Sequence, residues 1–277
     1  MSRFLVTLCV GLLTFAFAEA GQEDFPTALG KWTILDPPGR QSGEWLVANN
    51  DFKHEWVVTL RDGRPVAHLR VKEAPAPLPF EIAPGTAREG LSGQRLSTKV
   101  SDGWIVAYNA GEFGAGLWWF SPDGKKRDKI SEAWINGFIE TKSGLLALEG
   151  IAHGIGSEGQ ILRLDRSLAE RWRSEVFVKL EHAPYVGVKQ ADGSLIIATT
   201  DRLLRVVPAD KKVEVLLDNA FWGGLYPNSI VATQDGTIYL GMRHGVAKLE
   251  RTSGKSKVTW LLPNQEFANM KLEEGFK

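Results

Sequence analysis

The chain has 277 residues, and its 33 Lys plus Arg balance its 33 Asp plus Glu, so the formal net charge at pH 7 is zero. This balance argues against a broad basic surface, and we expect neither nucleic acid nor an anionic membrane surface as a partner. The 29 glycines, the ten tryptophans and the shortage of long helix-favouring segments predict an all-β fold of many short strands.

The first twenty residues have the pattern of a secretory signal peptide. Arg3 precedes a nearly unbroken apolar run, Phe4–Phe17, and small residues follow where signal peptides are cleaved. We therefore predict a signal peptide over 1–20 and a secreted or periplasmic mature domain, 21–277, with no membrane contact after cleavage; an uncleaved anchor is the alternative. Cys9, the single cysteine, lies in the leader, so the mature chain can form no disulfide, as suits a bacterial periplasm or exterior.

The mature chain consists of copies of one unit: a short strand, a turn that ends in Gly, a second apolar strand, and one or two further strands. The first copy is degenerate, with Ser42-Gly43 followed by EWLVANN (44–50), for which we predict a strand, and WVVTLR (56–61), a further strand. After it comes Lys72–Gly85, whose four prolines cannot donate to a β-ladder. We predict that this segment is an extended surface insertion.

Four clearer copies follow, marked by the turns Asp102-Gly103, Ser143-Gly144, Asp192-Gly193 and Asp235-Gly236. Asp-Gly is a favoured dipeptide of tight hairpins because Gly adopts positive φ without strain. The four glycines are 41, 49 and 43 residues apart, which is the length of a four-stranded propeller blade.

The repeats predict that residues 21–277 form a single β-propeller of four-stranded blades. Five blades fit the count of copies; six are the alternative, if Phe25–Pro38 and the C-terminal tail complete another. We expect an N-terminal strand, with Trp32–Leu35 as the candidate, to close the ring on the last blade. A β-sandwich with coincidental turn spacing is the competing architecture.

Two resemblances follow from the last copy. Ser229–Glu250, with its strand, Asp-Gly turn, strand and Gly, resembles the repeat of two-component-regulator-type propellers. Tyr226-Pro227-Asn228 resembles a segment of the SMP-30/gluconolactonase propellers, in which the Asn binds a divalent metal. That resemblance implies a metal-binding role for Asn228. It is limited to Pro227 and Asn228, since the family's Gly is Ser229 here and its other metal ligands and general-base Asp have no clear match.

Propeller topology predicts where a ligand would bind. The loops that enter each inner strand and the loops between the second and third strands open on one face, and binding sites collect on such loops. Four of the five histidines belong to these loops and are predicted to lie on that face, with His68 as the exception. The predicted ligand-binding residues there are Trp134, Asn136, Glu149, His153, His182, Tyr185, Trp222, Tyr226, Asn228, Arg243 and His244.

Three functions remain open from the sequence. The first is a binding module for a small molecule, carbohydrate or protein, because aromatic, amide and carboxylate side chains suit such ligands. The second is a lactonase-type hydrolase with one divalent cation, such as Ca²⁺ or Mg²⁺, held by Asn228, Asn136 and Glu149, because oxygen ligands suit these ions. The third is an assembly scaffold. The sequence contains neither Gly-x-Ser-x-Gly nor His-Glu-x-x-His.

Overall fold

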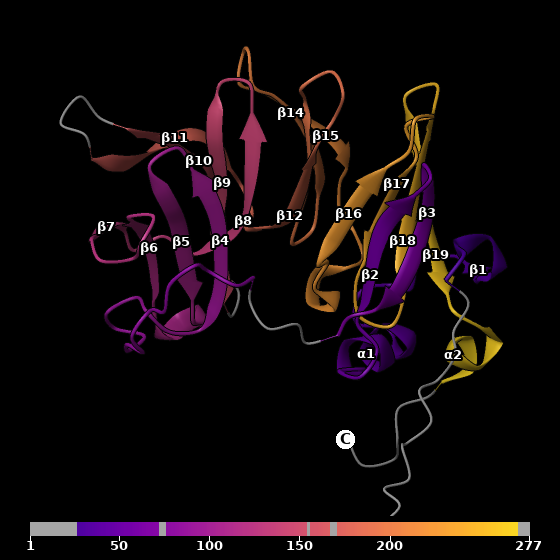
Figure 1. The fold of residues 1–277 in the computed structure, drawn as a ribbon. Coiled ribbons are helices and arrows are strands. Elements are labelled where there is room, and N and C mark those ends of the chain that lie inside the picture. The colour runs from indigo at the N-terminus through magenta and orange to yellow at the C-terminus, as the bar shows by residue number, and fades with distance from the viewer. Residues whose placement is uncertain (1–26, 72–75, 154–155, 167–170, 271–277) are drawn as a thin grey trace, which may run out of the picture.

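The computed structural model describes residues 27–71, 76–153, 156–166 and 171–270. Within them, the strands form five antiparallel sheets that follow one another as the blades of a β-propeller do (Figure 1). The predicted all-β propeller and its five blades are thus confirmed.

Three of the sheets contain four strands each, in chain order. The second sheet consists of β4 (Gln94–Val100), β5 (Gly103–Asn109), β6 (Ala115–Phe120) and β7 (Arg127–Ser131). The third consists of β8 (Ile135–Thr141), β9 (Gly144–His153), β10 (Gly156–Arg166) and β11 (Trp172–Leu180), and the fourth of β12 (Pro184–Lys189), β13 (Leu195–Thr199), β14 (Leu203–Val207) and β15 (Lys212–Leu217).

The last sheet has five strands, because an N-terminal strand joins it. β1 (Thr33–Leu35) pairs antiparallel with the outermost strand, so that Thr33 lies opposite Leu262. The predicted closure by this segment is therefore confirmed, and the added strand pairs backbone groups that would otherwise form an open edge. The other strands of the sheet are β16 (Ser229–Ala232), β17 (Ile238–Gly241), β18 (Val246–Thr252) and β19 (Lys255–Leu262).

The first sheet is the smallest. It consists of β2 (Trp56–Arg61) and β3 (Arg64–Leu69), joined at Asp62-Gly63, where both residues have positive φ. The chain at Thr27 runs beside β3, and its carbonyl accepts a hydrogen bond of 2.9 Å from the Ala67 N–H. The N-terminal part of the chain thus contacts both the first and the last sheet.

The prediction of a strand at 44–50 is wrong, because this segment lies within the helix α1 (Gly43–Asn50). Ser42 caps the helix, its hydroxyl oxygen accepting from the Trp45 N–H at 3.2 Å. The helix is held by its contacts: the indole N–H of Trp45 donates to the Phe221 carbonyl at 2.7 Å, and the Asn49 amide donates to the Gly224 carbonyl at 2.7 Å. A Ser-Gly pair can start a helix as readily as a turn, and these distant partners decided between the two.

The Asp-Gly turns use their carboxylates as well as their glycines. Asp192 accepts from the backbone N–H of Ser194 at 2.9 Å and from its hydroxyl at 2.6 Å, and Gly193 has a φ of +84°. Asp235 accepts in the same way from the Thr237 N–H at 3.1 Å. These hydrogen bonds fix the hairpin ends, which explains why this dipeptide marks the repeat so clearly.

The proline-rich segment packs back onto the protein. Of the predicted insertion, residues 72–75 lie outside the described part, and 76–85 contains no strand. Leu78 and Ile82 pack against a buried cluster of the β4–β7 sheet, and Phe80 stacks on Phe120 with ring centroids 5.6 Å apart. The segment is therefore a cover for this sheet.

The core lies mainly between neighbouring sheets. In one cluster, Leu146 and Leu148 of β9 pack with Ile161 of β10 and with Leu195 and Ile197 of β13 in the next sheet. Strands buried on both faces explain the weak alternation of polar and apolar residues in the sequence. None of the described helices is long and apolar enough to span a bilayer.

The inner strands place the candidate site. β4, β8, β12 and β16 contact one another in succession, and β2 contacts β16 and β17. The loops that enter the inner strands lie along one edge of the molecule together with the two α-helices (lower edge in Figure 1), which we call the loop edge. The helices not yet described are η1 (Leu29–Lys31), η2 (Gly111–Phe113), η3 (Gly223–Leu225) and α2 (Gln265–Asn269).

Candidate functional site

Arg243 connects three segments of the loop edge. It comes from the β17–β18 loop, and its guanidinium carbon lies 4.5 Å from the ring centroid of Phe52 and 4.4 Å from that of Tyr226. Its Nε donates to a Glu55 carboxylate oxygen at 3.3 Å, and its Nη1 donates to the Asn49 carbonyl at 3.1 Å. A cation between two aromatic rings gains attraction from both ring faces. Arg243 therefore holds two aromatic side chains at the surface in fixed positions.

Tyr226 is strained and exposed. Its backbone is left-handed, with φ +52° and ψ +70°, and 48% of the residue is exposed. Its ring lies 5.9 Å from that of Tyr185, whose hydroxyl donates to the Gly223 carbonyl at 2.8 Å. Burial is the main cause that raises the pKa of Tyr185, so this hydroxyl stays a hydrogen-bond donor. Strained residues that persist are concentrated at functional sites.

Asn228 contributes a buried amide beside this group. Its backbone N–H donates to the Gly241 carbonyl at 2.9 Å. Both polar atoms of its side chain are buried, and neither makes a hydrogen bond with the residues that the structure describes. Such an unpaired amide costs about 1–3 kcal/mol. The fold thus keeps an unfavourable polar group at the entrance to β16.

A cavity of about 670 Å³ lies between the first sheet and the start of β4; we call it the junction cavity. Phe52 and Glu55 line it and connect it to Arg243. Glu55 is also 3.0 Å from Nη1 of Arg70, so one carboxylate serves two guanidinium groups. A cavity of about 740 Å³ lies beside the Asp62-Gly63 turn, away from these residues. The polar and aromatic side chains lining the junction cavity are Phe52, Lys53, Glu55, His68, Arg70, Gln94 and Arg95.

His244 is a buried structural residue, with 2% of it exposed. Its Nδ1 lies 2.7 Å from one carboxylate oxygen of Asp51, and the Nδ1 of His54 lies 2.7 Å from the other. Its Nε2 is 3.2 Å from the Phe267 carbonyl. Burial opposes the charge on Asp51, but the hydrogen bonds from His244 and His54 outweigh it and lower the pKa of this carboxyl. This cluster joins the end of α1 to the last sheet and to α2.

Asn136 connects neighbouring blades. Its side-chain oxygen accepts from the amide of Asn109 at 3.0 Å. Its nitrogen donates to the carbonyls of Gly150 and Pro184, both at 2.9 Å. The side chain is therefore fully engaged with the protein and serves as a bridge between sheets.

Glu149 and Trp134 lie together at a different place. Both line a cavity of about 440 Å³ on the β8–β11 sheet, with Glu158 and Gln160. Burial raises the pKa of Glu149, and the nearby charge of Glu158 adds to the effect. The indole N–H of Trp134 donates to the Gly111 carbonyl at 2.7 Å, which fixes the ring.

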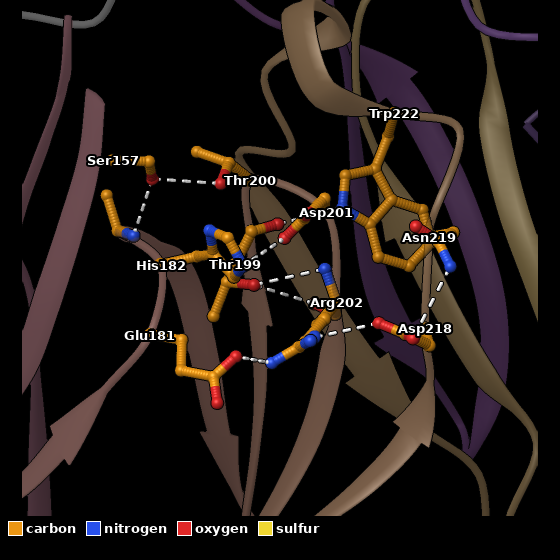
Figure 2. Close-up of polar contacts among 11 residues, drawn as sticks. Ser157, Glu181, His182, Thr199, Thr200, Asp201, Arg202, Asp218, Asn219 and Trp222 are labelled. Atoms are coloured by element: carbon orange, nitrogen blue, oxygen red, sulfur yellow. Dashed lines mark hydrogen bonds and ion pairs between the residues drawn. The ribbon is translucent and has the colours of Figure 1, made fainter. Parts of the chain in front are cut away.

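His182 lies in the connection from the third sheet to the fourth, and Trp222 lies in the connection from the fourth sheet to the fifth; Figure 2 shows both residues. Trp222 has no exposed surface, and its indole N–H donates to the Thr199 carbonyl at 2.9 Å, so it is a core residue. The Nε2 of His182 lies 3.3 Å from an Asp201 carboxylate oxygen. Beside them, Arg202 pairs with Glu181 and Asp218 (Figure 2). His153 ends β9, and its side chain lies outside the described part.

The three predicted metal ligands differ in what their side chains contact. Asn136 is bonded to three neighbours, Glu149 lies in the 440 Å³ cavity, and Asn228 stands at the entrance to β16. Among the described residues, no group of three or more His, Cys, Asp or Glu is placed to hold a metal. The metal site stays a prediction of the sequence.

Sequence reasoning missed most of the junction cavity. Phe52 and Lys53 follow the helix that was predicted as a strand, and Arg70 precedes the insertion. His68 was the one histidine left out of the predicted binding face, yet it lines the junction cavity. The signal that could have found these residues is the run of charged and aromatic residues at 51–56, between two predicted strands.

The sequence matches no family model and no curated relative. Among solved structures, it is similar to virginiamycin B lyase from Staphylococcus aureus, at 16% identity and a TM-score of 0.38, covering 59% of this chain and 53% of that one. It is also similar to the extracellular domain of a protein assigned to a hybrid two-component system of B. thetaiotaomicron, at 16% identity and a TM-score of 0.38, covering 57% and 21%. A third is an oligogalacturonate lyase in complex with manganese, at 11% identity and a TM-score of 0.32, covering 64% and 50%. This chain thus spans about half the length of two of these proteins and about a fifth of the other.

A two-component-system domain is among the structural neighbours, as the repeat resemblance anticipates, and the SMP-30/gluconolactonase resemblance stays a prediction.

Proposed function

We propose that this protein is a binding module, and that the junction cavity of its propeller takes a small-molecule ligand. The observation that carries the proposal is the arrangement around Arg243, which holds Phe52 and Tyr226 at the surface beside the cavity. Exposed aromatic rings cost free energy in water, and 68% of Phe52 is exposed. A ligand that packs on such a ring recovers that cost.

The strain in this part of the loop edge supports the same proposal. Tyr226, which contacts Arg243, and His244, which follows it in the chain, both have a left-handed backbone. A non-glycine residue in this conformation costs on the order of 1–2 kcal/mol. The fixed aromatic pair is therefore maintained against a local preference, which is characteristic of pre-organised binding sites.

The test is a screen of small metabolites by ligand-observed NMR with the purified chain and two variants. We expect compounds that bind the unaltered chain to show no binding signal with Phe52→Ala and to show the same binding signal with Phe113→Ala. Phe113 is the matched control, because 73% of it is exposed and it lies in η2. Compounds that bind equally to both variants, or a screen without a bound compound, would refute the proposal.

We also propose that the protein works outside the cytoplasm. The support is the basic start, apolar run and small-residue end of residues 1–20, which lie outside the described structure. Expression of the full chain with a C-terminal tag, followed by N-terminal sequencing of the exported protein, tests this. We expect a new N-terminus near Gly21, and an uncleaved chain retained with the membrane fraction would contradict it.

A further inference from the structure

The ligand class can be inferred from the charges of the junction cavity, and this step rests on the proposed function. We propose that the cavity binds an anionic sugar, one whose ring carries a carboxylate or a phosphate.

Cationic side chains outnumber anionic ones in the cavity. Among its described lining residues, Lys53, Arg70 and Arg95 carry a positive charge, and Glu55 carries the single negative charge. Glu55 is 3.0 Å from Arg70 and 3.3 Å from Arg243, so its charge is shared by two guanidinium groups. The local balance is therefore positive even though the chain as a whole is neutral. A cleft lined by one sign of charge concentrates small ions of the opposite sign.

The identity of the cations favours an oxyanion. A guanidinium presents N–H groups in a planar fork that matches the two oxygens of a carboxylate or phosphate. Arg95 enters from β4, and Arg70 comes from the end of β3 on the other side of the cavity. An anion placed between them would contact both sheets. Ligand binding would then join the first blade to the second.

The remaining lining suits a sugar ring. Phe52 offers an exposed aromatic surface, and Val57 and Val71 add apolar contacts. The C–H face of a pyranose can pack on such a surface, while Gln94 supplies both a donor and an acceptor for hydroxyl groups. The volume of about 670 Å³ lies within the range of about 300–1,000 Å³ that small-molecule sites occupy.

The experiment compares three sugars that differ at one position: glucuronate, glucose 6-phosphate and glucose. Binding to the purified chain is followed by ligand-observed NMR and isothermal titration. We expect an anionic sugar to bind and glucose not to bind. The affinities of glucuronate and glucose 6-phosphate then show whether the site prefers a carboxylate or a phosphate. We also expect binding to weaken severalfold between about 50 and 500 mM salt, because salt screens such charges.

Matched lysine variants locate the site. Lys53→Gln should weaken binding of the anionic sugar about tenfold, the usual effect of losing one charge-assisted hydrogen bond. Lys99→Gln should leave it unchanged, because Lys99 is exposed on β4 and does not line the cavity.

The possible failures are distinguishable. If glucose binds as tightly as the anionic sugars, or if Lys53→Gln has no effect, the anionic class is wrong and the binding module stands. If all three sugars fail while another metabolite binds and depends on Phe52, the sugar class is wrong and the site stands. If no compound depends on Phe52, both the class and the proposed function are wrong.

Discussion

The Oδ2 atom of Asp51 lies 2.7 Å from the Nδ1 atom of His244, although the two residues are 193 positions apart in the chain. Asp51 caps the C-terminal end of α1, and His244 lies in the loop between β17 and β18. Both are buried, and His54 contacts the second oxygen of the same carboxylate. The pair therefore ties the N-terminal helix to the last blade, at the residue that follows Arg243 in the chain.

Replacement of Asp51 tests this link. We expect Asp51→Asn to lower the free energy of unfolding by about 3 kcal/mol, because the buried carboxylate that accepts hydrogen bonds from two histidine rings is lost. Urea denaturation followed by tryptophan fluorescence measures the change. Asp128→Asn is the control, since Asp128 is exposed on the edge strand β7 and should change stability by less than about 0.5 kcal/mol. Equal effects of the two variants would show that the pair has no special role.

The same pair makes a prediction for pH. The pKa of Asp51 is lowered in the folded protein, so its carboxylate stabilises the fold above the unfolded pKa of about 4. This stabilisation is lost as the pH falls from about 4 towards the lower folded pKa. The difference in stability between the unaltered chain and Asp51→Asn should therefore narrow from pH 5 to pH 2. Thermal unfolding of both proteins over this range measures it, and a constant difference would contradict the assignment.

Asn228 should be replaceable by an apolar residue at no cost in stability. Its buried amide makes no hydrogen bond with the described residues, so Asn228→Leu removes an unfavourable group of similar size. We expect the free energy of unfolding to stay the same or to rise by about 1 kcal/mol. Asn136→Leu is the contrasting variant and should destabilise by about 2 kcal/mol or more, because it leaves the carbonyls of two neighbouring segments unpaired. If Asn228→Leu destabilises as much, the amide has a partner in solution.

Asn228→Leu also tests the metal site predicted from the sequence. Because the Asn136 side chain is already hydrogen-bonded to three protein groups, we expect Ca²⁺ and EDTA to leave the melting temperature of the unaltered chain unchanged. A Ca²⁺-dependent rise that disappears in Asn228→Leu would support the metal site instead.

Glu149 should respond to pH in the opposite direction from Asp51. Its pKa is raised, mainly by burial, so the folded state favours the protonated form. Stability is therefore lost as the pH rises from the unfolded pKa of about 4.3 through the higher folded value. Glu149→Gln, which stays neutral, should be modestly more stable than the unaltered chain at pH 7 and equal to it at pH 4. Glu112→Gln serves as an exposed control. If Glu149→Gln is less stable than the unaltered chain at pH 7, the folded protein favours the charged form of Glu149, and the prediction is wrong.

The sequence by itself determined the all-β class, the repeated blades, their number and the N-terminal closing strand. These features depend on local chemistry: Asp-Gly pairs form hairpin ends through their own carboxylates, and the spacing of the turns sets the length of each blade. Asn136, Tyr185, Tyr226, Asn228 and Arg243 were also assigned to the loop edge from topology alone.

Only the tertiary structure decided what those side chains contact. Residues 44–50 are helical because Trp45 and Asn49 bond to carbonyls some 175 positions away. Trp222 is buried and Tyr226 exposed, although both lie in the same loop. The junction cavity combines the ends of β3 and β4 with the residues after α1, a meeting that no local pattern encodes. Contacts between distant segments depend on how sheets pack, and packing is a property of the whole chain.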